Sequence, residues 1–303
     1  MNRTAKTWLI IAAVCVVLGP IMVVCAAAAA GGGFNFNSAE YETVIHEIGS
    51  TFDQIAVDTD ITDISIATAD EKQCKVECTE PEKVKHTAQV ENGTLVIRST
   101  DTGKWYENLF SFMRQSPKVV IYLPQSEYAS LQIDTHTGDV MIPPGLTFDT
   151  LTVNGNTSDV DCSASVTDTL TVKQDTGDVT LACPDAGSLD IGTSTGDIDI
   201  TSAKVKGNIS VTSTTGDITL TDTVAEKSFL IESTTGDISF ERCDAADLTV
   251  KSTTGDVTGT LLSDKIFKTS TSTGDVKVPN TNAGGKCEIS TSTGDIQINI
   301  KAK

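Results

Sequence analysis

Aspartates at a regular spacing are the residues of this sequence best placed to do chemistry. Each follows a glycine, or in one case a serine, and the spacing from one to the next is 19 or 20 residues. The nine residues are Asp139, Asp159, Asp178, Asp197, Asp217, Asp237, Asp256, Asp275 and Asp295. If these carboxylates stack, they repel one another, so each needs a compensating partner. Hydrogen bonds from nearby backbone N–H groups are the ordinary solution.

Calcium or magnesium is the alternative partner, because hard cations prefer carboxylate oxygens. The sequence therefore raises the hypothesis of weak metal binding along one row of side chains. The candidate ligands are Asp178, Asp197, Asp217, Asp237, Asp256 and Asp275. Calcium-binding β-rolls use a different, nine-residue unit. Equal melting temperatures in calcium and in a chelator would contradict the hypothesis.

The three histidines, His46, His86 and His136, do not predict a catalytic site. In a chain rich in Ser and Asp, some Ser-His-Asp combination is expected by chance. Parallel β-helix enzymes that act on polysaccharides place their acids irregularly in one groove, whereas these acids are regular and belong to turns. We therefore expect a protein that is not an enzyme, without catalytic residues or cofactors. An enzyme acting on envelope polysaccharide is the alternative.

The cysteines predict thiols rather than disulfides. Cys15 and Cys25 lie in an apolar segment near the N-terminus, and the remaining six lie beyond it. These six are Cys74, Cys78, Cys162, Cys183, Cys243 and Cys287. On strand geometry, the two candidate pairs, Cys74 with Cys78 and Cys162 with Cys183, are too far apart to bridge.

The aspartates belong to a repeat that must be built of strands. If the glycine is numbered zero, apolar residues recur at positions −7, −5, +2 and +4, as in Phe229, Ile231, Ile238 and Phe240 around Gly236. A spacing of two indicates strands with one buried face, and the parity change between −5 and +2 requires a corner. Glycine supplies the corner because it adopts positive φ freely. The predicted corner glycines are Gly138, Gly177, Gly196, Gly216, Gly236, Gly255, Gly274 and Gly294.

Hydroxyl side chains precede each corner. Thr occupies position −1 in every unit, and position −3 is mostly Ser or Thr. Both positions share parity with the apolar −5 and −7 sites, so we expect these hydroxyls to point inward and to bond from coil to coil. Exposed side chains at Thr215, Thr235 and Thr254 would contradict this expectation.

A single unit cannot bury its apolar face, so the units must stack. Parallel stacking superimposes like residues, which predicts an all-β, parallel β-solenoid of about nine coils of ~20 residues. The alternative makes each Thr-Gly-Asp a hairpin turn in a meander or sandwich.

Residues 39–130 break the period and are predicted to form an N-terminal β-rich cap in front of the solenoid at 131–303. Its expected strands are Gln54–Val57, Ile61–Ala67, Cys74–Cys78, Val84–Val90, Leu95–Arg98 and Lys118–Leu123, with a hairpin turn at Asn92-Gly93. Trp105–Met113 is the one amphipathic helix expected, with Trp105, Leu109, Phe112 and Met113 on one face. That face either plugs the end of the rod or contacts a partner or membrane.

The N-terminus predicts a membrane anchor. Residues 1–6 are basic and are expected to stay cytoplasmic, and 7–30 are apolar and long enough to span a bilayer. Residues 31–38 would then be a linker to a C-terminal domain outside the cell membrane. A cleaved signal peptide is the alternative, because Ala26–Ala30 offers small residues for cleavage.

The net charge of −19 excludes one class of partner, since an acidic surface repels the phosphates of nucleic acids. Three candidate partners of the chain remain: the membrane, contacted through the N-terminal helix; an envelope glycan or protein; and a second copy of the chain. The last follows from the absence of an obvious cap at the C-terminal end, where strands could pair end to end.

The strand Lys118–Pro124, the segment Leu131–Val140 that follows it, and the serial Ser-Thr-Thr-Gly-Asp-Ile units together resemble a known family. It is the bacterial "putative adhesin" family of β-strand-repeat membrane proteins, of the type found in Firmicutes envelopes. The resemblance covers roughly residues 40–303 and implies an adhesin, or an accessory or sensor of an envelope-stress system. It implies no catalytic residues.

Overall fold

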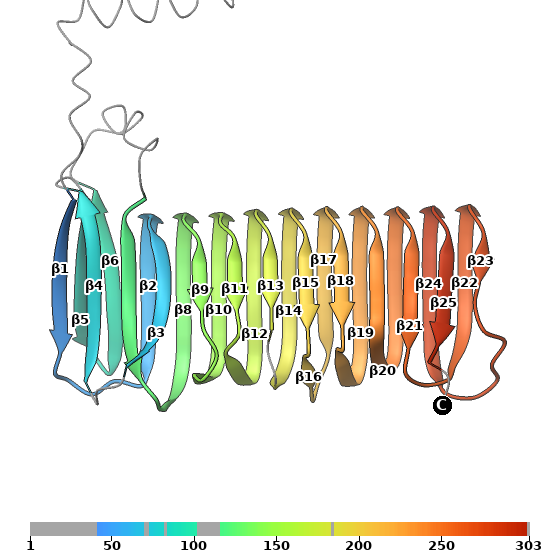
Figure 1. Ribbon diagram of the computed structural model, residues 1–303, viewed down its shortest axis with the longest axis horizontal. Coiled ribbons are helices and arrows are strands. Elements are labelled where there is room, and N and C mark those ends of the chain that lie inside the picture. Colours follow the sequence, from blue (N-terminus) through green and yellow to red (C-terminus); the bar gives the residue numbers. More distant parts are fainter. Residues whose placement is uncertain (1–40, 70–72, 82–83, 102–115, 183–184, 302–303) are drawn as a thin grey trace, which may run out of the picture. The chain divides into compact units, whose positions relative to one another are not determined.

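The computed structural model describes residues 41–69, 73–81, 84–101, 116–182 and 185–301, which belong to one compact unit, Tyr41–Lys303 (Figure 1). All of the regular structure in these ranges is β-strand. None of them contains a helix that could cross a membrane. The predicted cytoplasmic tail, anchor and linker, and the predicted helix Trp105–Met113, lie outside the described residues.

Each coil of the solenoid contributes a long strand before the glycine and a short strand after it. The long strands form sheet B: β8 (Glu127–Thr137), β10 (Thr147–Thr157), β12 (Ser165–Thr176), β14 (Ala186–Thr195), β17 (Ile209–Thr215), β19 (Val224–Thr235), the C-terminal part of β20 (Ile238–Thr254), β22 (Lys265–Thr273) and β24 (Gly285–Thr293). The short strands form sheet A: β9 (Val140–Ile142), β11 (Val160–Cys162), β13 (Val179–Leu181), β15 (Ile198–Thr201), β18 (Ile218–Thr221), the N-terminal part of β20, β21 (Val257–Leu261), β23 (Val276–Lys277) and β25 (Ile296–Ile300). The two-residue strand β16 (Lys204–Val205) adds to sheet B.

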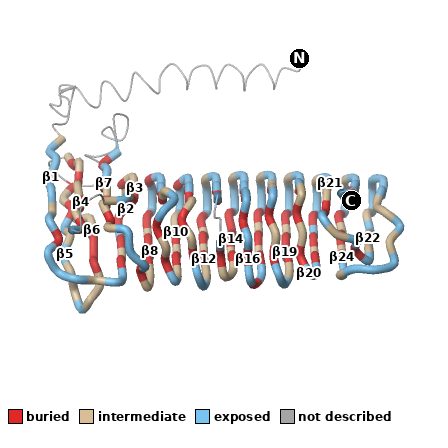
Figure 2. Tube along the Cα trace, turned by 60° about the horizontal axis from the view of Figure 1, so that its bottom comes forward, coloured by how far each residue is buried: buried red, intermediate tan, exposed pale blue. Residues whose placement is uncertain are grey.

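Like positions lie over like positions in both sheets. Val211 pairs with Ile231 in sheet B, and Ile218 pairs with Ile238 in sheet A, in parallel register. Parallel pairing of this kind continues from β8 and β9 to the C-terminal coils, so the predicted parallel β-solenoid is confirmed and the hairpin alternative is wrong. Apolar residues at −7, −5, +2 and +4 form one continuous core. Figure 2 shows the buried residues recurring from coil to coil along the stack.

The hydroxyl prediction is right at one position and wrong at the other. At −3 the side chains are buried, as at Ser213, Ser233 and Ser252. At −1 they are exposed, as at Thr215, Thr235 and Thr254. Position −2 is exposed as well, so the chain has already begun to turn after −3 and strand parity no longer applies there.

The N-terminal region combines stacked and antiparallel strands. It contains β1 (Tyr41–Ile48), β2 (Gln54–Ile61), β3 (Asp63–Ala69), β4 (Cys74–Pro81), β5 (Val84–Glu91), β6 (Thr94–Asp101) and β7 (Lys118–Pro124). Each predicted strand overlaps one of these, but the predicted Ile61–Ala67 crosses the corner at Thr62 between β2 and β3. Strand β2 lies between β6 and β8, and β3 lies between β7 and β9, all parallel. The parallel stack therefore begins before residue 131. Three further strands complete that end, with β4 antiparallel to β7, β1 antiparallel to β4, and β5 antiparallel to β6.

The C-terminal coils do not stack in sequence order. The last coil, β24 and β25, pairs on one side with β20 and β21 and on the other with β22 and β23. Its core residues Ile289, Ile296 and Ile298 are buried, whereas the end coil places Thr269 at −5 and leaves Val276 42% exposed. The more apolar coil is thus inside, and the more polar one forms the end.

Candidate functional site: a hydroxyl-lined groove beside an aspartate ladder

The corner at each glycine is fixed by close backbone contact. Gly236 has φ of 136°, and a Cβ added there would lie 2.1 Å from the carbonyl oxygen of Gly216 in the preceding coil. Every Thr-Gly-Asp glycine has the same positive φ and the same clash with a backbone oxygen. These glycines thus have the positive φ expected of a corner, and they also allow close contact between coils.

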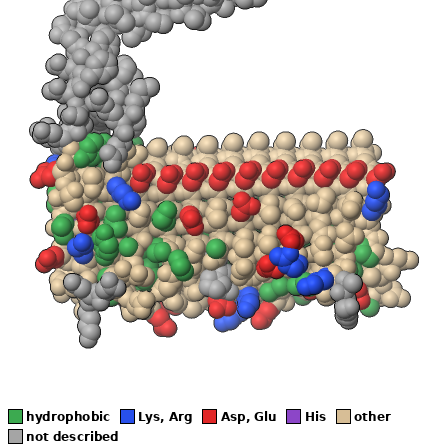
Figure 3. Space-filling view, in the orientation of Figure 1, with side chains coloured by type: hydrophobic (Ala, Val, Ile, Leu, Met, Phe, Trp, Pro, Cys, Tyr) green, Lys and Arg blue, Asp and Glu red, His purple; other side chains and the backbone are tan. Residues whose placement is uncertain are grey.

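The aspartates after the corners form a ladder along one edge of the rod (Figure 3). The Oδ1 atom of Asp217 accepts the backbone N–H of Asp237 at 2.7 Å, and the N–H of Asp217 donates to Asp197 at 2.8 Å. The same bond recurs from Asp63 at one end to Asp275 at the other. These bonds are the backbone partners that the sequence predicted, except that they join neighbouring coils.

Metal binding along this ladder stays a prediction. The described residues contain no group of three or more His, Cys, Asp or Glu side chains arranged to hold a metal ion. Each carboxylate that accepts a neighbouring N–H through Oδ1 keeps its second oxygen for another donor or for a cation. The candidate ligands Asp178, Asp197, Asp217, Asp237, Asp256 and Asp275 are all exposed members of the ladder.

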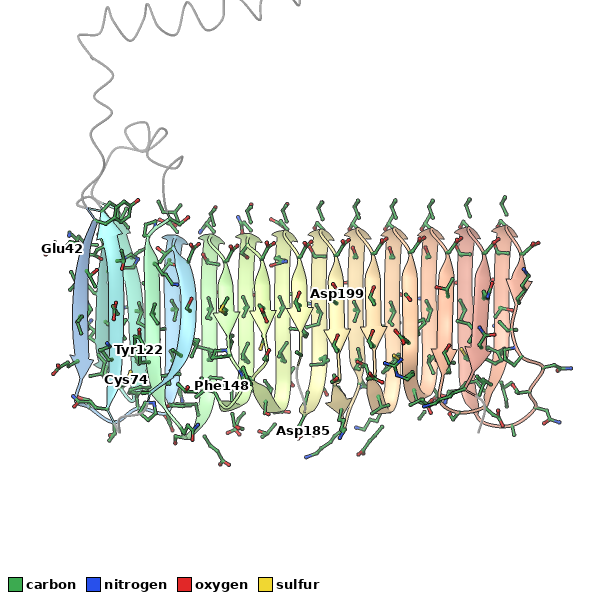
Figure 4. The ribbon with its side chains drawn as sticks, in the orientation of Figure 1. Glu42, Cys74, Tyr122, Phe148, Asp185 and Asp199 are labelled. Carbon is green, nitrogen blue, oxygen red and sulfur yellow. The ribbon has the colours of Figure 1, made fainter. Side chains whose placement is uncertain are left out.

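Beside the corners, the outer face of sheet B carries a groove of about 730 Å³. It crosses six long strands, β10, β12, β14, β17, β19 and β20, and its walls are the −4, −3 and −2 positions of each. Hydroxyl and amide groups predominate in its lining. The side chains at −4 and −2 are at least partly exposed: Asn154, Asn156, Ser194, Thr212, Thr214, Thr234 and Thr253. The side chains at −3 are buried: Gln174, Thr193, Ser213, Ser233 and Ser252. Figure 4 shows a row of side chains projecting beyond the ends of the long strands.

The charged side chains in the groove are largely neutralised by neighbours. Lys173 lies 2.6 Å from the Asp190 carboxylate, and Lys251 lies 2.8 Å from Glu232. All four groups are substantially solvent-exposed, so these ion pairs add little stability. Each partner can replace its ion pair with a hydrogen bond to another group. The groove thus offers alternating donors and acceptors without a strong net charge.

Two of the hydroxyls at −3 anchor the bend from inside. Thr193 donates to the carbonyl oxygens of Thr195, 3.2 Å away, and of Gly177 in the preceding coil, 3.4 Å away. Thr291 makes the equivalent bonds to Thr293 and Gly255. The predicted coil-to-coil bonding is confirmed at these two sites. It is wrong at four others, where the buried hydroxyl has no hydrogen-bond partner among the described residues: Thr135, Ser213, Ser233 and Ser252.

A separate polar cluster lies in the N-terminal cap. His86 Nδ1 lies 2.8 Å from Glu80 Oε2, and His86 Nε2 lies 3.0 Å from Thr62 Oγ1. An ionised Glu80 can only accept, so Nδ1 donates to it and Nε2 accepts from the Thr62 hydroxyl. The backbone N–H of His86 also donates to Glu80, and Lys85 pairs with the other carboxylate oxygen.

This Thr-His-Glu order resembles that of a hydrolase triad, but the side chains are sealed from solvent. Thr62 is fully buried, and Glu80 and His86 are 2% and 4% exposed. Burial lowers the pKa of His86, against the opposing effect of Glu80. The cluster joins β4 and β5 to the corner between β2 and β3, so we assign it to cap stability. His46 lies on β1, and His136 is an exposed residue at −2 that is near Asp60.

The described cysteines are core residues. Cys74, Cys78, Cys243 and Cys287 carry free thiols, as predicted, and Cys162 is buried at +4. Burial raises the pKa of Cys74, Cys78 and Cys287 to about 12. Cys183 lies outside the described residues, as do Cys15 and Cys25. The candidate contact face of Trp105, Leu109, Phe112 and Met113 lies outside them too.

Sequence reasoning missed the groove because it extended strand parity to −1 and so placed the −1 threonines in the interior, although it placed −3 correctly. The signal was present at −2 and −1, where two adjacent positions are both Ser or Thr in most units. Two adjacent polar residues cannot both face the core of a strand, so the pair indicates an exposed turn.

A family model described as Toastrack DUF4097 matches residues 52–299 of the chain. No curated protein matches it at a significant level. Among solved structures, a "putative adhesin" from Bacteroides fragilis NCTC 9343 is 16% identical, with a TM-score of 0.49 over 87% of this chain and 98% of that one. Another of that description, from Parabacteroides distasonis ATCC 8503, is 13% identical, with a TM-score of 0.49 over 86% and 98%. A "putative lipid binding protein" from Parabacteroides distasonis ATCC 8503 is 18% identical, with a TM-score of 0.37 over 88% and 98%.

Proposed function

This chain belongs to the Toastrack DUF4097 family, and we propose that it is a non-enzymatic scaffold that binds an extended envelope glycan along the groove of sheet B. The single observation that carries the proposal is the construction of the groove from the same three repeat positions in six successive strands. An extended polymer with hydroxyls at regular intervals meets equivalent donors and acceptors at every coil, ~4.8 Å apart.

The chemistry of the groove favours a neutral glycan over a polyanion. Its lysines are already paired with carboxylates, and the chain as a whole carries a net charge of −19. A polyanionic chain would therefore be repelled at long range. Ser and Thr hydroxyls together with Asn and Gln amides can both donate and accept, which suits sugar hydroxyls.

Repetition also distinguishes this proposal from a polysaccharide-cleaving enzyme. Cleavage requires one unique pair of groups at a defined point of the groove, whereas binding benefits from equivalent sites along it. The positions that line the groove are repeat positions, and their acids are paired or belong to separate coils. We favour binding on that ground.

We further propose that the scaffold is held outside the cell membrane. In this proposal residues 7–30 form a single-pass anchor, 31–38 a linker, and the strands act in adhesion or as an accessory or sensor of envelope stress. The apolar character of 7–30 and the basic residues before it support the orientation.

The test is binding of the full chain, in detergent, to immobilised neutral and anionic polysaccharides. We expect binding to a neutral polysaccharide, and we expect Thr234→Arg to weaken it about tenfold or more, equivalent to ~1.4 kcal/mol. Thr234 lies on the exposed wall of the groove, so the larger side chain obstructs the ligand without entering the core.

The matched control is Met141→Arg, which adds the same side chain to an exposed position, 55% accessible, on strand β9 of sheet A. It should leave the affinity unchanged. Equal affinities for the wild-type chain and Thr234→Arg would place the ligand elsewhere and contradict the proposal. Release of new reducing ends during incubation would instead favour the enzymatic alternative.

A further inference from the structure

The C-terminal end of the rod has unpaired edges in both sheets. Strands β22 and β23 pair only with β24 and β25, and their other edges face away from the stack. At this end Ile266 is 50% exposed and Val276 42% exposed. Within the described ranges, no N–H donates to the Asp275 carboxylate, although the other ladder aspartates each receive one.

The N-terminal end has unpaired edges in the same two sheets. Among the described strands, β1 is the outermost of sheet A and pairs with β4 alone, while β5 is the outermost of sheet B and pairs with β6 alone. Ile45 on β1 is 54% exposed. Ile45, Ile266 and Val276 are three of the six large exposed hydrophobic side chains of the described chain.

The two ends match in strand direction, and in sheet B they also match in length. At the sheet B edges, β5 has eight residues and β22 nine, whereas at the sheet A edges β1 has eight and β23 two. Because β1 is antiparallel to β4, and β4 to β7, β1 runs in the same direction as the parallel stack. A second copy translated along the rod would therefore place β1 parallel to β23 and β5 antiparallel to β22. Both are normal ladder geometries.

Most charges at the two ends are already paired within the copy. Glu42 of β1 pairs with Lys85, Lys268 of β22 with Glu288, and the buried Lys265 with Asp244. The remaining charges on the two sheet A edge strands are opposite in sign, Glu47 on β1 and Lys277 on β23. A lysine on an edge strand normally opposes strand addition, and here Lys277 disfavours pairing of two C-terminal ends and favours an acidic partner.

We propose that the C-terminal edge of one copy docks on the N-terminal edge of a second copy, so that both sheets continue from molecule to molecule. Such a head-to-tail contact joins different surfaces, and it generates open filaments rather than closed dimers. The unpaired edges, the exposed apolar side chains and the opposite charges of Glu47 and Lys277 together carry the inference.

The test is sedimentation velocity of the full chain in detergent. We expect concentration-dependent assemblies at low salt that dissociate near ~1 M salt, where the Debye length falls to ~3 Å. Ile45→Arg places a cation on the same strand as Glu47, and Val276→Glu places an anion next to Lys277. Each variant alone should sediment as the smallest species, and Met141→Arg, on the side of the rod, should assemble like the wild type.

A mixture of the two variants decides the geometry. The Ile45→Arg chain keeps an intact C-terminal edge and the Val276→Glu chain an intact N-terminal edge, so differently tagged copies should co-purify as a mixed complex. Pairing of two C-terminal ends would instead leave Ile45→Arg fully associated. A chain that stays in its smallest form at every concentration, or assemblies that survive both substitutions, would overturn the proposal.

Discussion

At the scale of the residue, the glycine and the aspartate of each corner have different roles. The glycine allows the backbone of one coil to approach the carbonyl of the next, and the aspartate after it accepts an N–H from the following coil. The result is a corner whose two critical residues act between coils rather than within one. Substitutions there should affect the stack more than the local turn.

Gly236→Ala tests this directly. The added Cβ would meet the Gly216 carbonyl oxygen, and alanine would have to adopt φ of 136°, so we expect a loss of about 3 kcal/mol in the free energy of unfolding. Gly192→Ala is the matched control, because its Cβ would meet mainly movable side-chain atoms of Lys173 and Thr212. Equal denaturation midpoints for both variants would contradict the role assigned to the corner.

The buried thiols predict how stability depends on alkaline pH. A thiol in the unfolded chain titrates near 9.0, whereas burial raises the pKa of Cys74, Cys78 and Cys287 to about 12. Between these values the unfolded chain binds fewer protons, so the stability present below pH 9 should fall as pH rises toward 12.

Denaturant titrations across this range should show a shallower fall for Cys287→Val than for the wild type. A thiol reagent should leave Cys74, Cys78 and Cys287 unmodified at pH 8 in the native chain and modify them after denaturation. Rapid labelling of these three residues in the native chain would show that they are not sealed in the core.

At the scale of the element, the last coil of the chain does not lie at the end of the stack. Strand β24 lies between β20 and β22, and β25 between β21 and β23. The arrangement places Ile289, Ile296 and Ile298 inside, while Thr269 is left near the end. Burial of apolar surface therefore outweighs the simpler connection.

Engineered cysteines distinguish the two orders. Lys251 and Ser290 are direct neighbours in sheet B, so the pair Lys251→Cys and Ser290→Cys should form a disulfide across ~5 Å. Ser270 is neighbour to Ser290 on the other side, which puts it two strands, roughly 10 Å, from Lys251. The control pair Lys251→Cys and Ser270→Cys should stay reduced. If this pair oxidised and the first pair did not, the coils would be stacked in sequence order.

At the scale of the whole molecule, the rod concentrates negative charge on one edge. The ladder aspartates recur every ~4.8 Å, which is less than the Debye length of ~10 Å at 0.1 M salt. Neighbouring carboxylates therefore repel one another under ordinary conditions, although each helps to bond the next coil. The net charge of −19 adds repulsion over the full length.

Salt should accordingly stabilise the rod. Raising sodium chloride to ~1 M shortens the Debye length to ~3 Å, below the coil spacing, and should raise the melting temperature by about 2–4 °C for each kcal/mol of repulsion removed. Asp217→Asn keeps an oxygen acceptor for the Asp237 N–H and removes one charge, so it should reduce the salt effect. A melting temperature that falls with salt would contradict the argument.

The sequence alone determined the repeat, the corner glycines, the strands of the cap and the parallel stack. It could do so because identical side chains at −7, −5, +2 and +4 gain a core only when like positions overlie one another. The aspartate partners followed too, since acids spaced by one coil require donors. The chain next to the corner was less predictable, because strand parity ends where the backbone turns, so Thr215 and its equivalents were placed on the wrong side.

Only the tertiary structure decided the groove, the buried contact of His86 with Glu80 and Thr62, and the exchanged order of the last two coils. Each of these depends on which segments meet in space. Coil order in particular depends on which of two similar coils buries more apolar surface. The observed order leaves the more polar coil exposed to water.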